Sequence, residues 1–228
     1  MFPLRDSTPS NHFPLVTVSL IIVNFLIFYF EGSLSPPQLN ALIYQLGLVP
    51  AYVHFEQLNP LVYIPFLTSM FLHGSWMHVL GNMWMLWLFG DNVEDCMGHL
   101  KFLLFYLGTG VVAGLTHYFT DPFSAVPVIG ASGAVAGIMG AYFLMFKKAR
   151  VLTLIFPFFL VTMPAWFFLG IWAMTQLWSG TAALLHSATS SEQIAFWAHV
   201  GGFAAGMLFY RLFLRPQARQ RLANTNNS

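Results

Sequence analysis

The chain has 228 residues, of which 57% are hydrophobic and only 7% are charged. Ordinary soluble domains carry about 25% charged residues, so this chain has too few charges to solvate a globular surface, which predicts an integral membrane protein. A net charge of +1 gives no broad basic surface for nucleic acid, and the single cysteine, Cys96, excludes an intrachain disulfide.

The first apolar run, Phe13–Phe30, predicts a membrane span that is retained in the mature protein. It is longer than the apolar part of a signal peptide, has no strongly basic flank and is not followed by a small-residue cleavage site. Residues 1–12 before it are expected to form a short cytoplasmic segment. The following stretch, 31–75, contains many aromatic, Leu and Pro residues and only two charges, which indicates a loop lying against the membrane surface.

Five further apolar runs follow, and a helical span needs about 20 such residues. They are Trp76–Gly90, His99–Phe119, Ala131–Phe146, Val151–Trp178 and Gln193–Leu214. The fifth span of the six is long and contains Pro157 and Pro164, which are expected to bend it. The sequence predicts an all-α polytopic membrane protein with six transmembrane helices over residues 13–214, followed by a polar, basic cytoplasmic tail at 215–228.

The distribution of positive charge agrees with this count of spans. Six spans place both termini on one side of the membrane, and that side then holds all nine Lys and Arg residues of the chain. The three loops on the opposite side, near 31–75, 120–130 and 179–192, contain neither Lys nor Arg. Because cytoplasmic flanks collect positive charge, both termini are predicted to lie in the cytoplasm.

Polar groups inside spans are costly and therefore mark candidate sites. The stretch "HGSWMHVLGN" contributes His73, His78 and Asn82, "GASG" contributes Ser132, and "AHVGGFAAG" contributes His199. His78 and Asn82 share one helix face through their i, i+4 spacing. The second, fourth and sixth spans all run from outside to inside, so these groups are expected at a similar depth below the outer face.

Small residues near Ser132 and His199 predict close packing of the fourth and sixth spans. A serine activated by histidine needs oxygen and nitrogen within about 2.6–3.2 Å. Glycines at four-residue spacing permit such an approach, and the two spans supply Gly133 and Gly137, and Gly202 and Gly206, respectively. Ser132 then lies at a helix N-terminus, where free N–H groups favour developing negative charge.

Each of these residues also has a simpler interpretation. Ser132 alone suits a helix contact, Asn82 suits an interhelical hydrogen bond, and His199 suits a hydrogen-bonded bundle histidine. A zinc site made by His73, His78 and His199 is a further alternative, although the sequence contains no HExxH pattern and no carboxylate was expected within the spans. A transporter is another alternative, but we find neither an inverted repeat nor charged pathway residues.

Taken together, the three motifs resemble the rhomboid intramembrane serine proteases, specifically the six-span bacterial form, over residues 14 to 214. The resemblance implies that Ser132 is the nucleophile and His199 the general base. His78, Asn82 and the Ser132 backbone N–H would form the oxyanion hole. It also implies that transmembrane proteins are cut near the outer face of the cell (inner) membrane, with no metal or other cofactor. An inactive relative that binds client spans is the alternative within the family.

The chain differs from many rhomboids at two places. Many have Tyr one turn after the serine, stacking on the catalytic histidine, where this chain has Ala136. Many carry Trp-Arg in the first outer loop, where this chain has Ile64–Pro65. No buried Asp was identified to orient His199, so the orienting group must come from elsewhere. The fifth span and the loop after it are expected to form a substrate gate, with Phe167 or Trp172 closing it.

Overall fold

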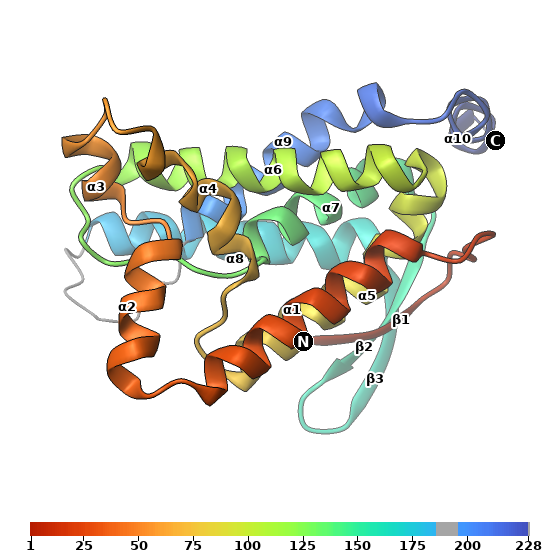
Figure 1. The fold of residues 1–228 in the computed structure, drawn as a ribbon. Helices are drawn as coiled ribbons and strands as arrows, with labels where there is room; N and C mark the ends of the chain where they lie inside the picture. The colour runs from red at the N-terminus through yellow and green to blue at the C-terminus, as the bar shows by residue number, and fades with distance from the viewer. Residues whose placement is uncertain (186–195, 228) are drawn as a thin grey trace.

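The computed structural model describes residues 1–185 and 196–227, and helices dominate it (Figure 1). The longer helices are α1 (Leu15–Ser33), α2 (Pro36–Leu46), α5 (Trp76–Met97), α6 (His99–Thr120), α7 (Ser132–Met145), α8 (Ala165–Leu185), α9 (Phe196–Phe213) and α10 (Pro216–Asn227). The short helices between α2 and α5 are α3 (Pro50–Phe55), η1 (Pro60–Tyr63), α4 (Pro65–Thr68) and η2 (Ser69–Phe71). The strands are β1 (Phe2–Asp6), β2 (Arg150–Ile155) and β3 (Phe159–Pro164).

Five of the predicted spans correspond to helices, namely α1, α5, α6, α7 and α9. Helix α5 continues past Gly90 to Met97 and so includes the acidic residue Glu94. Glu94 is buried, and its carboxylate accepts hydrogen bonds from the backbone N–H groups of Val16 and Thr17, both at 2.8 Å. These bonds stabilise the charged group inside the bundle. The first residues of the predicted sixth span, 193–195, lie outside the described residues, as do residues 186–192 of the outer loop.

The predicted fifth span, Val151–Trp178, is wrong as a single bent helix. Its first part folds into the antiparallel hairpin β2–β3, and only from Ala165 does helix α8 begin. The hairpin strands are rich in β-branched residues such as Val151, Thr153 and Val161, which favour strands over helices. Pro157 lies in the turn and Pro164 ends β3, so neither bends a helix.

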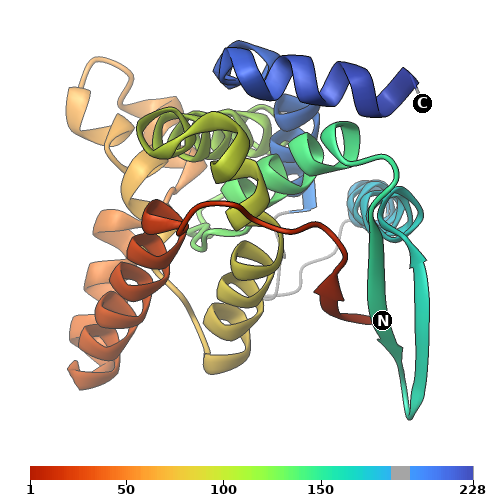
Figure 2. The same ribbon diagram turned by 90° about the vertical axis from the view of Figure 1, so that its right-hand side faces the viewer.

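The fold is therefore not purely helical. A three-stranded antiparallel sheet has the order β1-β2-β3, with Phe2 opposite Leu154 and Asp6 opposite Val151. The N-terminal residues, expected as a separate short segment, are part of this sheet, and β1 lies between α5 and the hairpin (Figure 2). The predicted tail likewise contains α10.

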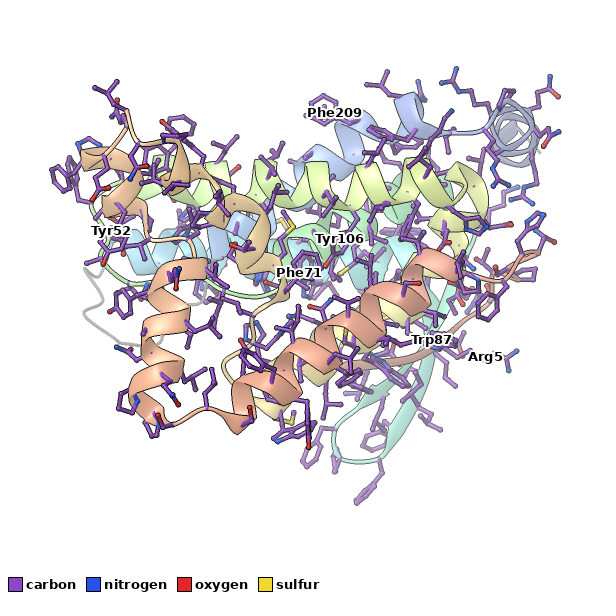
Figure 3. The ribbon with its side chains drawn as sticks, viewed as in Figure 1. Arg5, Tyr52, Phe71, Trp87, Tyr106 and Phe209 are labelled. Carbon is purple, nitrogen blue, oxygen red and sulfur yellow. The ribbon has the colours of Figure 1, made fainter. Side chains whose placement is uncertain are left out.

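Helix α7 occupies the centre of the bundle, packed against α6, α9 and α5. Every residue from Gly133 to Tyr142 is buried. Tyr106 of α6 also points into the interior, whereas Trp87 and Phe209 lie at the periphery (Figure 3). A helix surrounded by other helices needs no polar face, which explains the continuous apolar and small-residue sequence of α7.

Two of the described helices, α1 and α6, are long and apolar enough to cross a membrane by length and composition, and α7 is a shorter apolar helix. Large apolar side chains on α1 also face outward, including Ile22, Leu26 and Tyr29. Exposed apolar surface of this kind fits contact with lipid rather than water.

Candidate active site

Ser132 begins helix α7, directly after the N-cap residue Ala131. The preceding loop is held by backbone hydrogen bonds. Leu48 and Val128 exchange two of them, at 3.0 and 2.8 Å, and the Gly130 N–H donates to the Ser69 carbonyl at 2.8 Å. These bonds connect the loop between α1 and α5 to the start of α7, so the position of Ser132 is fixed by segments far apart in the sequence.

His199 lies on α9, and its Nε2 is 2.7 Å from the Oγ of Ser132. Both side chains are half-buried. The distance falls in the range expected for a nucleophile paired with its base. The two residues that the sequence proposed as partners are thus in hydrogen-bond contact across the α7–α9 interface.

The close approach of α7 and α9 depends on glycine. A Cβ at Gly202 would collide with the carbonyl oxygen of Gly133, and one at Gly206 would collide with that of Gly137. The Cβ positions of Gly133 and Gly137 themselves point elsewhere, toward Ala113 and Thr109 of α6. The small residues of α7 therefore allow two neighbouring helices to approach, α6 as well as the α9 partner that was expected from the sequence.

Helix α8 supplies two contacts to His199 that the sequence analysis missed. The Nδ1 of His199 lies 2.7 Å from Oε1 of Gln176, and the indole of Trp172 lies 5.9 Å from the imidazole between ring centroids, tilted by 38°. Their i, i+4 spacing places both on one face of α8. The spacing of Trp172 and Gln176 is visible in the sequence. It identifies a face toward His199 only when the start of α8 after the hairpin is known.

The contact with Gln176 assigns the proton of His199 to one of its two ring nitrogens. With the amide oxygen as acceptor, Nδ1 is the protonated nitrogen, and Nε2 is left free to accept from the Ser132 hydroxyl. Many rhomboids have Tyr one turn after the serine, where this chain has Ala136. Here the aromatic ring beside the imidazole is that of Trp172. The role of Trp172 in a substrate gate stays a prediction, and its ring packs beside the histidine.

His78 and Asn82 lie on the first turns of α5, beside the same cavity as Ser132. Ser75 caps this helix by accepting from the His78 N–H at 3.2 Å. Gly130 has φ +122°, and a Cβ there would lie 2.5 Å from the His78 Nε2, so only glycine fits between this imidazole and the start of α7.

Asn82 is held in place by His73, whose Nε2 lies 3.1 Å from the Asn82 Nδ2. The rings of His73 and His78 are 5.1 Å apart between centroids. His73, one of the polar candidates from the sequence, therefore helps to orient the Asn82 amide. Its backbone N–H faces both carboxylate oxygens of Glu31, at 3.3 Å each.

Glu31, which the sequence placed in the loop after the first span, is a buried carboxylate. It is near the end of α1 and is only 2% exposed. This carboxylate does not complete a metal site, because the described residues contain no group of three or more His, Cys, Asp or Glu arranged to hold a metal ion. The zinc alternative therefore gains no support from the geometry.

A cavity of about 620 Å³ contains the serine and histidine. Its polar lining comes from His78, Asn82, Ser132 and His199, and most of the remaining lining is apolar, including Met85, Met139 and Phe168. The lining also includes three residues of the N-terminal segment: Met1, Phe2 and Pro3. A cavity with few converging polar groups in an apolar wall is typical of a ligand or substrate site.

The fold and the site together define a class: a helical membrane protein with a serine–histidine pair inside its bundle. Comparison with known families gives the same answer, because residues 61–216 match the Rhomboid domain. The chain therefore belongs to the rhomboid family. Proteins of this family are embedded in membranes and are generally intramembrane serine proteases.

Individual relatives come from bacteria and from organelles. The rhomboid protein YdcA of Bacillus subtilis (strain 168) is 38% identical over 79 residues, covering 35% of this chain and 39% of YdcA. Rhomboid protein 1, mitochondrial, of Saccharomyces cerevisiae is 26% identical over 194 residues, covering 80% of this chain and 53% of that protein. The mouse presenilin-associated rhomboid-like protein, mitochondrial, is 29% identical over 132 residues, or 54% of this chain and 35% of its own length. The matched regions thus span about half of these relatives or less.

Proposed function

We propose that the protein is an intramembrane serine endopeptidase that cleaves transmembrane proteins through a Ser132–His199 dyad. The observation that carries this proposal is the 2.7 Å contact between Ser132 Oγ and His199 Nε2 inside the cavity. A hydroxyl is a weak nucleophile until a base accepts its proton, and the orientation of His199 leaves Nε2 available for that role.

The reaction follows from the positions of these groups. Ser132 Oγ attacks the scissile carbonyl while Nε2 of His199 takes its proton, which gives a tetrahedral intermediate. His199 returns that proton to the leaving amine, and an acyl-enzyme forms. Water then attacks the acyl-enzyme with His199 again acting as the base, which releases the second product and restores the serine.

The negative charge of the intermediate needs donors close to Ser132. We assign this role to the Ser132 backbone N–H at the start of α7 and to the side chains of His78 and Asn82 on α5, which line the same cavity. The Asn82 amide is already oriented by His73, so it can donate without first losing side-chain freedom. Removing one donor of this kind typically lowers a rate by about 10²–10³-fold.

Gln176 and Trp172 act as positioning residues for His199. The Gln176 carbonyl holds the protonated Nδ1, which is the task of the buried Asp in a triad, but it does so without a charge. Trp172 limits rotation of the imidazole by packing beside it. Positive charge that develops on His199 is therefore stabilised by a dipole rather than by a carboxylate.

We further propose how the chain lies in the membrane. The six spans would be α1, α5, α6, α7, α8 and α9, within a membrane domain over residues 13–214. Residues 6–12 and the basic tail at 215–228 would lie on the cytoplasmic side of the cell (inner) membrane, and residues 1–5 would extend from there into the bundle as β1. Cleavage would then occur near the outer face, with lipid surrounding the bundle and no cofactor required.

Labelling with a fluorophosphonate tests this function directly. The wild-type protein in detergent should react at Ser132, whereas the Ser132→Ala and His199→Ala variants should not, provided that all three elute alike on size exclusion and melt at similar temperatures. Full proteolytic activity in a folded Ser132→Ala variant would reject the serine-protease mechanism. Binding of a transmembrane reporter without any cleavage or labelling by the wild type would favour an inactive, client-binding rhomboid.

A further inference from the structure

Strand β1 forms part of the wall of the cavity that contains Ser132. Met1, Phe2 and Pro3 line this cavity together with the serine and with His199. The strand is the edge of the β1-β2-β3 sheet and lies between β2 and helix α5 (Figure 2). An extended piece of polypeptide thus lies beside the proposed catalytic residues.

The backbone of β1 is held from both sides. Along one edge it pairs antiparallel with β2, with Phe2 opposite Leu154. On the other side the indole N–H of Trp84 donates to the Pro3 carbonyl at 2.7 Å, and the ring of Trp84 stacks on Phe2 with centroids 5.4 Å apart. These contacts hold an extended backbone and one aromatic side chain, and the backbone part does not depend on the sequence of the strand.

The last residue of the strand, Asp6, and the two residues after it are fixed by a separate set of polar contacts. Tyr142 of α7 donates to the Asp6 carboxylate at 2.6 Å, the Ser7 N–H donates to the Arg150 carbonyl at 2.9 Å, and Asn92 donates to the Thr8 carbonyl at 3.2 Å. Within the strand Pro3 is buried, whereas Phe2 is 46% exposed, and Arg5 is exposed and projects away from the bundle (Figure 3). Residues 1–5 can therefore leave β2 while residues 6–8 stay attached.

Departure of β1 would leave backbone groups of β2 without partners. In a bilayer, unsatisfied backbone groups are strongly unfavourable because no water is present to pair with them, so this edge requires another occupant. A transmembrane substrate also acquires unpaired backbone groups when it is cleaved. Its helix must unwind before a serine can attack a peptide bond, and unwinding also exposes unpaired N–H and C=O groups.

We propose that β1 occupies the place of the substrate. An extended segment of a membrane-protein substrate would replace residues 1–5 on the edge of β2, with the Trp84 indole donating to one of its carbonyls and apolar side chains entering the cavity. This mode of binding is strand addition, and it rests on the proposed protease function. It makes β1 a built-in competitor that must move before cleavage.

A disulfide between the two strands tests the proposal. Residues directly opposite in an antiparallel pair lie close enough for a disulfide, about 4.5–5.5 Å between Cα atoms, so Phe2→Cys with Leu154→Cys should pin β1 when an added oxidant removes two electrons and two protons from the thiols. The matched control is Leu154→Cys with Leu160→Cys, which joins β2 to β3 at a paired position and leaves β1 free. The native Cys96 is buried.

Two readouts separate this proposal from the proposed function. The first is cleavage of a fluorescent reporter with one apolar transmembrane segment that has Ala and Gly in its outer third. The second is labelling by a fluorophosphonate, which is small compared with the cavity of about 620 Å³ that exists with β1 in place.

The oxidised β1–β2 variant should cleave the reporter at least tenfold more slowly than the reduced form, while labelling changes by less than twofold, and a reductant should restore cleavage. The oxidised β2–β3 control should cleave at its reduced rate. Undiminished cleavage by the pinned variant, or an equal loss in the control, would overturn the strand-addition proposal. Absence of labelling in the wild type would instead overturn the serine-protease function.

Discussion

The two sides of the His199 imidazole are built in opposite ways. On the Ser132 side, α7 and α9 meet through glycines with no room for a methyl group, and α7 is buried along most of its length. On the Gln176 side, α8 carries bulky residues that are largely exposed, such as Trp166, Met174 and Trp178. The base is therefore held by a rigid interface at Nε2 and by a more loosely packed helix at Nδ1.

This difference suggests a division of tasks between the two regions. The α7–α9 contact fixes the reacting atoms, because the two helix backbones are packed as closely as glycine allows and have no free space in which to shift. Helix α8, which lines the cavity through Phe168 and Trp172, can move with less loss of packing, and the β2–β3 hairpin before it contacts β1. The following predictions test this comparison, beginning with the largest expected effect.

Removing either reacting group should abolish most of the activity. We expect Ser132→Ala and His199→Ala each to lower reporter cleavage by roughly 10⁴-fold or more, and the double variant to be no worse than the more damaged single variant, because each residue acts only through the other. Single-turnover rates of the three variants provide the measurement. Losses that multiply in the double variant would show that the two residues act independently.

A side chain at the tightest point of the α7–α9 contact should reduce stability and activity together. In Gly202→Val, the new side chain collides with the backbone of Gly133, and overpacking of this kind costs about 1–3 kcal/mol. We expect a lower midpoint of thermal inactivation and at least a tenfold loss of cleavage.

The matched control for this contact is Gly108→Ala on α6, where a Cβ meets no atom within 4 Å. This variant should keep the activity and thermal midpoint of the wild type. If Gly202→Val inactivated at the same temperature as Gly108→Ala, the close contact would not be a determinant of stability.

Loss of the acceptor at Gln176 should lower kcat more than it changes KM. Gln176→Met keeps the length of the side chain but removes its carbonyl, so we expect a loss of about 10–100-fold in kcat, and Gln176→Glu should recover most of it. Imidazole ¹⁵N spectra should show that the proton of His199 is no longer confined to Nδ1 in the methionine variant.

Met174→Leu is the control for Gln176, because Met174 lies on the same helix and is 65% exposed, whereas the neighbouring Thr175 hydroxyl accepts from the Gln176 amide at 3.5 Å. Its kcat and its imidazole spectrum should match the wild type. An unchanged kcat and unchanged spectra in Gln176→Met would contradict the positioning role of Gln176, but not the Ser132–His199 dyad.

Truncation on the outer face of α8 should have the smallest effect and the opposite sign. Phe167 is 44% exposed and packs edge-to-face on Trp166, away from His199. We expect Phe167→Ala to raise cleavage of the transmembrane reporter by about two- to fivefold if movement of α8 limits entry of the substrate. Fluorophosphonate labelling, which needs no such movement, should stay within twofold of the wild type, and a parallel fall in both rates would contradict the gate.

The sequence by itself determined the features that follow from composition and short-range pattern. The scarcity of charge predicted a membrane protein, and the motifs around Ser132, His199 and the His78–Asn82 pair selected the groups that line one cavity. The family is confirmed by the Rhomboid domain match. These inferences succeed because burial of polar groups in a membrane is costly and therefore informative wherever it occurs.

Only the tertiary structure decided what depends on contacts between distant segments. The sequence predicted one bent helix at 151–178, because apolar runs with prolines do not distinguish a helix from a hairpin until a partner strand is known. Pairing of β1 with β2 and the approach of Gln176 to His199 are likewise long-range contacts. No local period encodes them, since each one depends on how the helices pack around α7.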